Sequence, residues 1–191
     1  MGKDKSFLVW EGKPLLEQIV ANFPDVDDLF LSARDASQPL PITARCVYDS
    51  RADIGPLAGL VASLRIARNK SLFITTCDAP FVSQSVSDIL FEAKDESDDV
   101  VVPMTEDGMV HPLIAVYGKS ILPRAEAFLD GGKRRMRDLL DILRVKIVES
   151  SVFPDGDKCF ININTPEDLM AAKGAKAYDT TNCGCRLWFQ E

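Results

Sequence analysis

Two aspartates stand where buried, strand-like runs of the sequence end. Asp49 closes the run RCVYD, and Asp78 closes the run LFITTCD, after which Pro80 fixes a turn. If both runs are parallel strands of one sheet, both carboxylates lie at the carboxyl-end edge, where open α/β sheets bind ligands. Carboxylate oxygens suit Mg²⁺, which keeps several waters and shares substrate phosphates. The sequence favours this function for Asp78, whereas Asp49 fits equally well as the cap of a following turn.

A short glycine loop, DIGPLAG, leads into a helical run. Gly55 permits close backbone approach, and a helix that begins near Pro56 presents unpaired N–H groups and a positive dipole end. An anion or the edge of a nucleotide can dock at such a place. Many ordinary connections also use a short glycine loop.

Two groups of polar residues follow later in the chain. Asn162 and Asn164 in FININTPEDL lie two residues apart, hence on one face of a strand, where they can bond ribose hydroxyls, a pterin or a metal-bound water. Equally, they can orient the capped helix that follows. The run GGKRRMRDL gathers Lys133, Arg134, Arg135 and Arg137. Arginine suits bidentate phosphate binding, although such a run also forms solvated helix faces.

The elements that must position these residues alternate along the chain. Strands are expected at 27–33, 44–49, 71–78, 98–104, 110–118, 145–150 and 158–164, and helices at 13–23, 56–68, 83–94, 119–132, 134–143 and 165–177. This alternation predicts one α/β domain with a mostly parallel central sheet flanked by helices. The one histidine, His111, lies inside an expected strand and is assigned no catalytic role.

Bulk properties limit the classes of function. The 191 residues fit one domain, and the net charge of −7 disfavours nucleic acid and anionic membranes as partners. The five cysteines show no regular framework, and no apolar run approaches a membrane span, so a cytoplasmic location is expected. The last residues, 177–191, fit no element. Cys183 and Cys185 could be a metal or redox pair, but an irregular extension with Trp188 and Phe189 packed against the domain is favoured.

Taken together, these motifs resemble the molybdenum cofactor guanylyltransferase family. The segments MGKDKSFLVWEGKPLLEQIV, DIGPLAGL, TTCDAPFV, HPLIAVY, GKRRMRDLL and FININTPEDL follow one another in the family's order, up to about Lys173. The resemblance implies a Rossmann-like nucleotidyltransferase domain, here placed at 1–176, with a tail at 177–191. It further implies transfer of GMP from GTP to molybdopterin, with release of pyrophosphate, and partners among the proteins of molybdenum cofactor biosynthesis.

The resemblance also implies roles for individual residues. Asp78 would hold Mg²⁺ and Lys5 would contact the triphosphate, both as catalytic residues. The nucleotide site would comprise Lys5, Ser32, Asp49, Gly55 and Asp78, with Ser32 standing where some members carry asparagine. The pterin side would comprise Arg134, Arg135, Asn162 and Asn164.

Family members usually begin with a strand and a glycine-rich loop of the form LAGG-x-S-x-R-M-G, and this sequence begins at the M-G of that loop. The missing strand would lie inside the sheet and leave its two neighbours with unpaired backbone groups and exposed apolar faces, which a folded domain could tolerate only with compensation. We therefore expect the native chain to start upstream, and transfer to be weak without the loop. The alternatives are a related transferase that uses CTP or another acceptor, and a nucleotide-binding accessory protein without catalysis.

Overall fold

The computed structural model describes residues 9–10, 12–26, 28–33, 42, 44–48, 55–163, 168 and 186–190. Its strands are β1 (Val9–Trp10), β2 (Lys13–Pro14), β3 (Asp28–Ala33), β4 (Arg45–Tyr48), β5 (Ser71–Thr76), β6 (Val100–Met104), β7 (Ala115–Gly118), β8 (Val145–Glu149) and β9 (Arg186–Gln190). Its helices are α1 (Leu15–Ala21), α2 (Pro56–Ile66), α3 (Gln84–Glu92), α4 (Leu122–Asp130) and α5 (Met136–Leu140), with 3₁₀ turns η2 (Lys119–Ile121), η3 (Ser150–Val152) and η4 (Gly156–Phe160).

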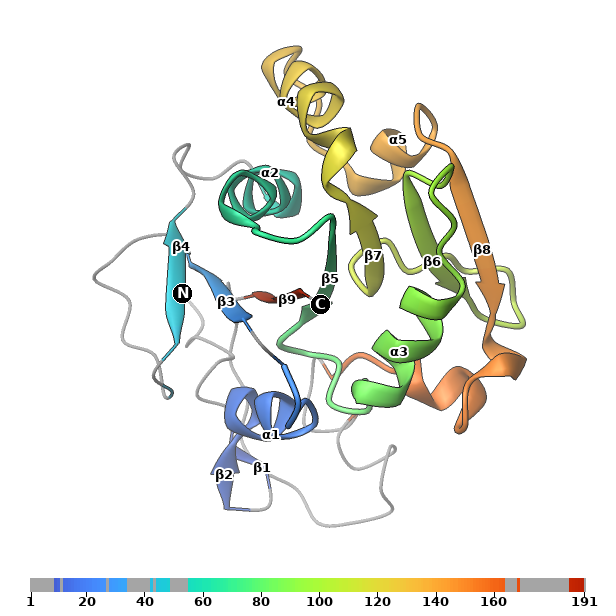
Figure 1. The fold of residues 1–191 in the computed structure, drawn as a ribbon. Helices are drawn as coiled ribbons and strands as arrows, with labels where there is room; N and C mark the ends of the chain where they lie inside the picture. The colour runs from blue at the N-terminus through green and yellow to red at the C-terminus, as the bar shows by residue number, and fades with distance from the viewer. Residues whose placement is uncertain are drawn as a thin grey trace.

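A seven-stranded sheet in the order β4-β3-β9-β5-β7-β6-β8 forms the centre of the fold (Figure 1). β3 pairs with β4 and β6 pairs with β8 in parallel, whereas β7 and β9 are antiparallel to both of their neighbours. It follows that β3, β4, β5, β6 and β8 all run in one direction. The expectation of a mostly parallel α/β sheet is confirmed, and all five of these strands end at one edge, which we call the carboxyl edge.

Successive side chains of a strand point to opposite faces of the sheet. The buried strands carry apolar side chains on both faces, and helices cover both. Phe73 packs on the face with α1 and α3, while its neighbours Leu72 and Ile74 pack on the face with α2, α4 and α5. The same alternation separates Leu31 from Phe30 in β3. Figure 1 shows the resulting three layers, with α1 and α3 on one side of the sheet and α2, α4 and α5 on the other.

Strand β9 occupies the middle of the sheet, between β3 and β5 (Figure 1). Its residues pair with Asp28–Ser32 on one side and with Phe73–Thr76 on the other. The irregular extension expected at the end of the chain is therefore wrong for residues 186–190. β9 supplies hydrogen-bond partners to two strands that would otherwise present unpaired edges in the centre of the sheet.

Two further expectations about secondary structure are wrong. The run expected as a strand over 158–164 forms the end of η4 followed by irregular backbone to Ile163, so Asn162 does not lie on a strand. The strand expected over 110–118 is shorter, since β7 begins at Ala115 and His111 lies in the turn before it. In the expected helix 165–177, helical backbone is described at Asp168.

Among the described residues, every helix is too short or too polar to cross a bilayer.

Candidate functional site at the carboxyl edge

The carboxyl edge brings together the ends of strands that carry several predicted site residues. Ser32 lies one residue before the end of β3, and the register pairs Ala33 with Tyr48, the last residue of β4. Thr76 ends β5, two residues before Asp78. Because β3, β4 and β5 run in the same direction, their last residues lie at this one edge.

Asp78 is held at this edge by two contacts. The hydroxyl of Thr76 donates a hydrogen bond to Oδ1 of its carboxylate. The backbone N–H of Ile163 donates to the Asp78 carbonyl oxygen at 2.7 Å. The side chain is partly buried, so the carboxylate is oriented by the fold and still reaches solvent. The role of Thr76 was not predicted from the sequence, although its position two residues before Asp78, in the run Thr-Cys-Asp, would have indicated the contact.

The loop that follows Asp78 is fixed by a residue from a distant helix. Asn22, the residue after α1, donates from Nδ2 to the carbonyls of Pro80 and Val82 at 2.9 and 3.1 Å. Its own carbonyl accepts a hydrogen bond from the N–H of Gln84 at 3.0 Å. This amide therefore fixes the turn between β5 and α3, and nothing in the local sequence around Asn22 points to that contact.

The bond from Ile163 to Asp78 brings the segment around Asn162 to the same edge. Asn162 itself is exposed. Two residues earlier, Phe160 is buried and stacks on the His111 ring, with centroids 5.1 Å apart and planes 25° apart. Phe160, which stacks on His111, and Asn162 thus lie on one short segment, and the next residue, Ile163, is bonded to Asp78.

His111 sits in a partly buried and mixed electrostatic environment. Burial lowers its pKa from the ordinary value, the charge of Arg137 lowers it further, and the carboxylates of Asp107 and Asp157 raise it. The buried Tyr117 donates from its hydroxyl to the carbonyl of Pro112 at 2.8 Å, which pins the turn that carries His111. His111, assigned no role from the sequence, is therefore a member of this region.

The basic run lies beside this group. Arg134 and Arg135 are exposed and directly precede α5. Arg137, within α5, is close enough to lower the pKa of His111. This proximity links the basic run to the His111–Phe160 stack, although the roles of Arg134 and Arg135 stay predictions.

Gly55 and Ser32 are placed on the other side of Asp78. Gly55 is the N-cap of α2 and has φ 86°, a conformation that glycine adopts readily, and it carries no side chain to cover the first amides of the helix. Ser32 is buried in β3, beside Val47 of β4 and Arg186 of β9 in register. The predicted residues Lys5, Asp49 and Asn164 lie outside the described residues.

Asp78 could hold a divalent cation only if substrate phosphates and waters supplied most of the ligands, as is typical of magnesium. No group of three potential ligands among His, Cys, Asp and Glu side chains occurs in the described part of the chain. Mg²⁺ commonly binds through one or two carboxylates plus substrate phosphates and waters. A partly exposed carboxylate, oriented by a hydroxyl at the ligand-binding edge, meets that requirement.

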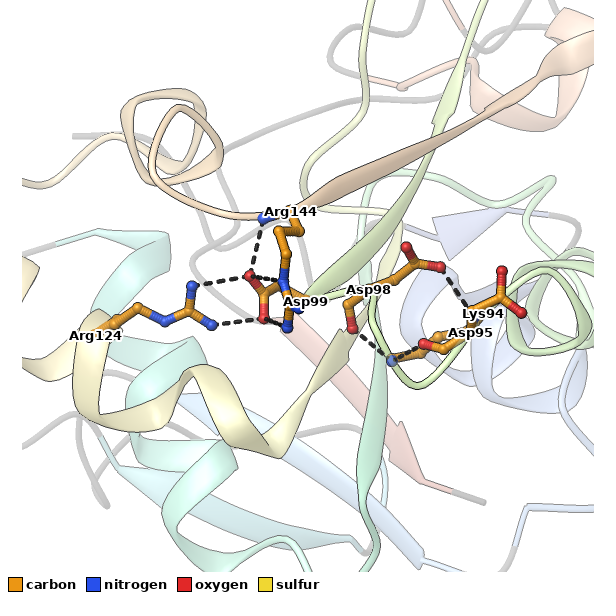
Figure 2. A network of polar contacts seen from close by, with 6 residues as sticks. All are labelled: Lys94, Asp95, Asp98, Asp99, Arg124 and Arg144. Atoms are coloured by element: carbon orange, nitrogen blue, oxygen red, sulfur yellow. Dashed lines mark hydrogen bonds and ion pairs between the residues drawn. The ribbon is translucent and has the colours of Figure 1, made fainter.

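A second polar cluster lies at the opposite edge, where β6 and β8 begin. Figure 2 shows Arg124 and Arg144 converging on the carboxylate of Asp99, at 2.6 and 3.1 Å to Oδ1. The Asp99 side chain is fully buried, and these partners hold its pKa well below the usual range. Because both oxygens are taken up by arginines, this cluster ties α4 and the start of β8 to β6 and offers no free ligand.

Comparisons with known proteins agree with this architecture. Residues 1–147 match the profile of the MobA-like NTP transferase domain. The chain is similar to a protein of Methanosarcina mazei described as a probable molybdenum cofactor guanylyltransferase, with 36% identity over 87% of this chain and 80% of the relative. It is 30% identical to a molybdenum cofactor guanylyltransferase of Vibrio atlanticus, over 88% of this chain and 86% of the relative.

Solved structures show the same likeness. The crystal structure of molybdopterin-guanine dinucleotide biosynthesis protein A from Archaeoglobus fulgidus superimposes with a TM-score of 0.73 at 26% identity, over 89% of each chain. A 2-C-methyl-D-erythritol 4-phosphate cytidylyltransferase from Thermus thermophilus shares the fold, with a TM-score of 0.65 at 22% identity over 89% of this chain and 92% of that one.

Proposed function

The chain belongs to the family of MobA-like NTP transferase domains, and from this membership we propose that it is a molybdenum cofactor guanylyltransferase. It transfers GMP from GTP to molybdopterin and releases pyrophosphate, in the cytoplasm and with Mg²⁺. The observation that carries the proposal is the 36% identity to a probable guanylyltransferase over most of both chains. The oriented carboxylate of Asp78 at the carboxyl edge supports it independently.

In the proposed reaction, a phosphate oxygen of molybdopterin forms a bond to the α-phosphorus of GTP as the bond to the pyrophosphate oxygen breaks. Reactions of this type need little covalent chemistry from the protein, so binding, alignment and charge neutralisation dominate. Bound at Asp78, Mg²⁺ would neutralise charge on the phosphates. Thr76 would keep the carboxylate turned toward that position, because its hydroxyl occupies one carboxylate oxygen.

The remaining residues divide between the two substrates. Lys5, Asp49, Ser32 and Gly55 would serve the nucleotide side, with the amides at the start of α2 available to an anion. Asn162, Asn164, Arg134 and Arg135 would serve the pterin side. The support for that side is that Asn162 lies on the segment bonded to Asp78, that Phe160 of the same segment stacks on His111, and that Arg137 lies near His111.

A pyrophosphate-release assay tests the proposal. The full chain is supplied with Mg²⁺, molybdopterin and one of GTP, CTP or ATP, and the dinucleotide product is identified by mass spectrometry. GTP-dependent release that requires molybdopterin supports the proposal. Release with CTP alone would identify a cytidylyltransferase, and GTP binding by calorimetry without release would identify an accessory protein, so either result rejects guanylyl transfer.

A further inference from the structure

The sheet has a hollow at the edge opposite Asp78, outside the site of the proposed reaction. This amino-edge hollow lies where β5 begins and β7 ends, since the register partners Ser71 and Gly118 both line it. Its volume of about 570 Å³ is within the range of sites for small molecules. β5 rises about 3.3 Å per residue, so the hollow lies about 17 Å from the strand end near Asp78. A ligand bound there would therefore occupy a second site.

Cationic side chains from separate segments of the chain line the amino-edge hollow. Arg68 and Lys70 follow α2. Lys94 follows α3, and Lys119 begins η2. The whole chain has a net charge of −7, so cations gathered at one hollow oppose the overall field. This local charge favours an anionic ligand.

Two acidic side chains, Asp95 and Glu96, line the same hollow and reduce its positive charge only in part. The Asp95 carboxylate lies 2.7 Å from Nζ of Lys146, and this partner lowers its pKa. Its charge is therefore balanced by a lysine of β8. The carboxylates of Asp88 and Glu92 line an adjoining hollow beside α3, so an anion is favoured on the side away from that helix.

Backbone carbonyls hold two of the ammonium groups in place. Nζ of Lys94 donates to the carbonyl oxygens of Asp95 and Asp98 at 3.0 and 2.7 Å (Figure 2). Nζ of Lys119 donates to the carbonyl oxygen of Ala67. An ammonium group has three N–H donors, so these bonds use two donors of Lys94 and one of Lys119. The remaining donors are suited to the acceptor oxygens of a ligand.

Gly118 leaves space beside two groups of the lining. A Cβ at this position would lie 3.4 Å from Oγ of Ser120 and 3.5 Å from Cε of Lys94. Without that atom, the Ser120 hydroxyl and the Lys94 side chain border one open spot. Phe91 adds an aromatic ring to the same lining. The hollow therefore offers cations and a hydroxyl to an anionic group, and an apolar ring to the rest of a ligand.

We propose that the amino-edge hollow binds a small molecule with a phosphate group, whose oxygens lie at the lysines and Ser120 and whose apolar part packs against Phe91. A phosphate presents more acceptor oxygens than a carboxylate, and its charge-assisted hydrogen bonds to ammonium groups are strong. Binding at this site requires no Mg²⁺, because the protein supplies the cations. The site does not depend on the proposed transfer reaction.

An NMR titration of the full chain, with phenyl phosphate as the probe and without Mg²⁺, tests the proposal. The backbone amides of Ser71, Gly118 and Ser120 are expected to shift with one dissociation constant. Lys70→Gln is expected to weaken binding by about 5-fold, the scale of one lost hydrogen bond. Lys13→Gln is the matched control, since it removes the same charge from an exposed residue of β2. That control is expected to bind like the unmodified chain.

Gly118→Ala tests the same site without a change of charge. The backbone at Gly118 is extended, with φ −71°, so alanine fits, and its methyl group would make ordinary contacts with Ser120 and Lys94. Because the methyl group fills the open spot, we expect it to weaken binding of phenyl phosphate by about 5-fold, the scale of one added methyl group in a filled space. Inorganic phosphate is expected to bind more weakly than phenyl phosphate, since it lacks the ring.

Three results would overturn the proposal. They are the absence of a saturable shift at the amides of the hollow, shifts confined to the amides around Asp78, and equal losses in Lys70→Gln and Lys13→Gln. Unchanged amide shifts away from the hollow show that a variant keeps its fold. If Gly118→Ala disturbs the fold, the two lysine variants decide, because both residues are exposed. The pyrophosphate-release assay is independent, so failure of the transfer reaction leaves this measurement intact.

Discussion

Two aspartates of the parallel strands have opposite surroundings. Asp99 precedes β6, is fully buried and is neutralised by two arginines. Asp78 follows β5, is partly exposed, and has no lysine or arginine paired with it in the described part of the chain. A carboxylate already neutralised by arginines is a poor cation ligand, whereas one oriented by a hydroxyl keeps its negative charge available. Their surroundings therefore identify Asp99 as a structural aspartate and Asp78 as a candidate catalytic one.

Asp78→Asn is expected to reduce turnover by about 100-fold or more, the scale of a lost electrostatic contact in a transition state. The amide keeps the size of the side chain and can still accept the hydrogen bond of Thr76, so the fold should remain. Steady-state pyrophosphate release and thermal unfolding measure the two effects. Near-normal turnover would remove Asp78 from the mechanism.

Thr76→Val removes the hydroxyl that orients Asp78 and keeps the branched shape of the side chain. We expect kcat to fall by about 10-fold, because a misplaced carboxylate loses alignment, and the concentration of Mg²⁺ required for half-maximal rate to rise. Thr76→Ser retains the hydroxyl and is the matched control. Equal magnesium dependence in Thr76→Val and the unmodified chain would show that the bond has no positioning role.

His111 offers a pH-dependent measurement at the same scale. It is the one histidine of the chain, and burial lowers its pKa below 6.5. An NMR titration should show this shift, and Asp107→Asn should lower the pKa further because the Asp107 carboxylate raises it. As the pH falls, the His111 imidazole of the unfolded chain is protonated near pH 6.5, whereas that of the folded chain is protonated only at a lower pH. This residue's contribution to stability is therefore present above that pH and is lost as the pH falls through the folded pKa. A pKa at or above 6.5 would contradict the described environment.

At the scale of elements, the Asp99 cluster joins segments that are far apart in sequence. Arg124 belongs to α4, Arg144 precedes β8, and Asp99 directly precedes β6. The cluster fixes the amino ends of β6 and β8, whose carboxyl ends face the candidate site. The neighbouring Lys94 donates to the carbonyls of Asp95 and Asp98, which closes the loop before β6 (Figure 2).

Asp99→Ala is expected to lower the free energy of unfolding by about 2 kcal/mol, because charged hydrogen bonds are lost and a small cavity forms. Asp95→Asn is the control, since its ion pair with Lys146 is exposed to solvent and is expected to contribute little to stability. Urea unfolding at pH 7 measures both. Because its partners hold the Asp99 pKa below the usual value, the contribution of this group to stability should be present above about pH 4 and be lost progressively as the pH falls further. Equal stability of the two variants would show that the cluster contributes no more than a surface pair.

At the scale of the whole molecule, the sheet depends on its last strand. β9 joins the half formed by β3 and β4 to the half that begins with β5. Without it, two central strands would each present a row of unpaired backbone groups. The candidate site spans this seam, with Ser32 on one side and Asp78 on the other.

Removal of residues 186–191 is therefore expected to destabilise the domain by at least about 4 kcal/mol, since β9 pairs along both edges and each backbone hydrogen bond contributes about 1 kcal/mol. That is a large share of the about 5–15 kcal/mol that stabilises a typical domain. Deletion of Glu191 alone is the control. Thermal unfolding and the exchange of amides in β3 and β5 are the measurements. A truncated chain as stable as the control, with protected amides in both strands, would show that β9 does not hold the sheet together.

The local pattern of the chain was sufficient for most of the elements. The apolar runs that became β3, β5, β6 and β8 read correctly as strands, and the glycine before Pro56 marked the start of α2. Asp78 was identified because it directly follows a buried run that ends at a proline turn. The expectation of a strand over 158–164 is wrong because Cys159, Phe160 and Ile163 are buried in the core from the end of η4 and the irregular backbone after it, so their apolar character did not require a strand.

The sequence by itself determined the layered α/β class and the position of Asp78 at a strand end, because periodicity and turn residues act over a few neighbouring positions. Only the tertiary structure decided that Thr76 orients Asp78, that Ile163 brings Asn162 to the same edge and that His111 stacks on Phe160. It also decided that β9 runs through the centre of the sheet. The physical reason is that backbone hydrogen bonds between strands are nearly the same for every residue type, so strand order follows from which distant segments bury each other and from no local pattern.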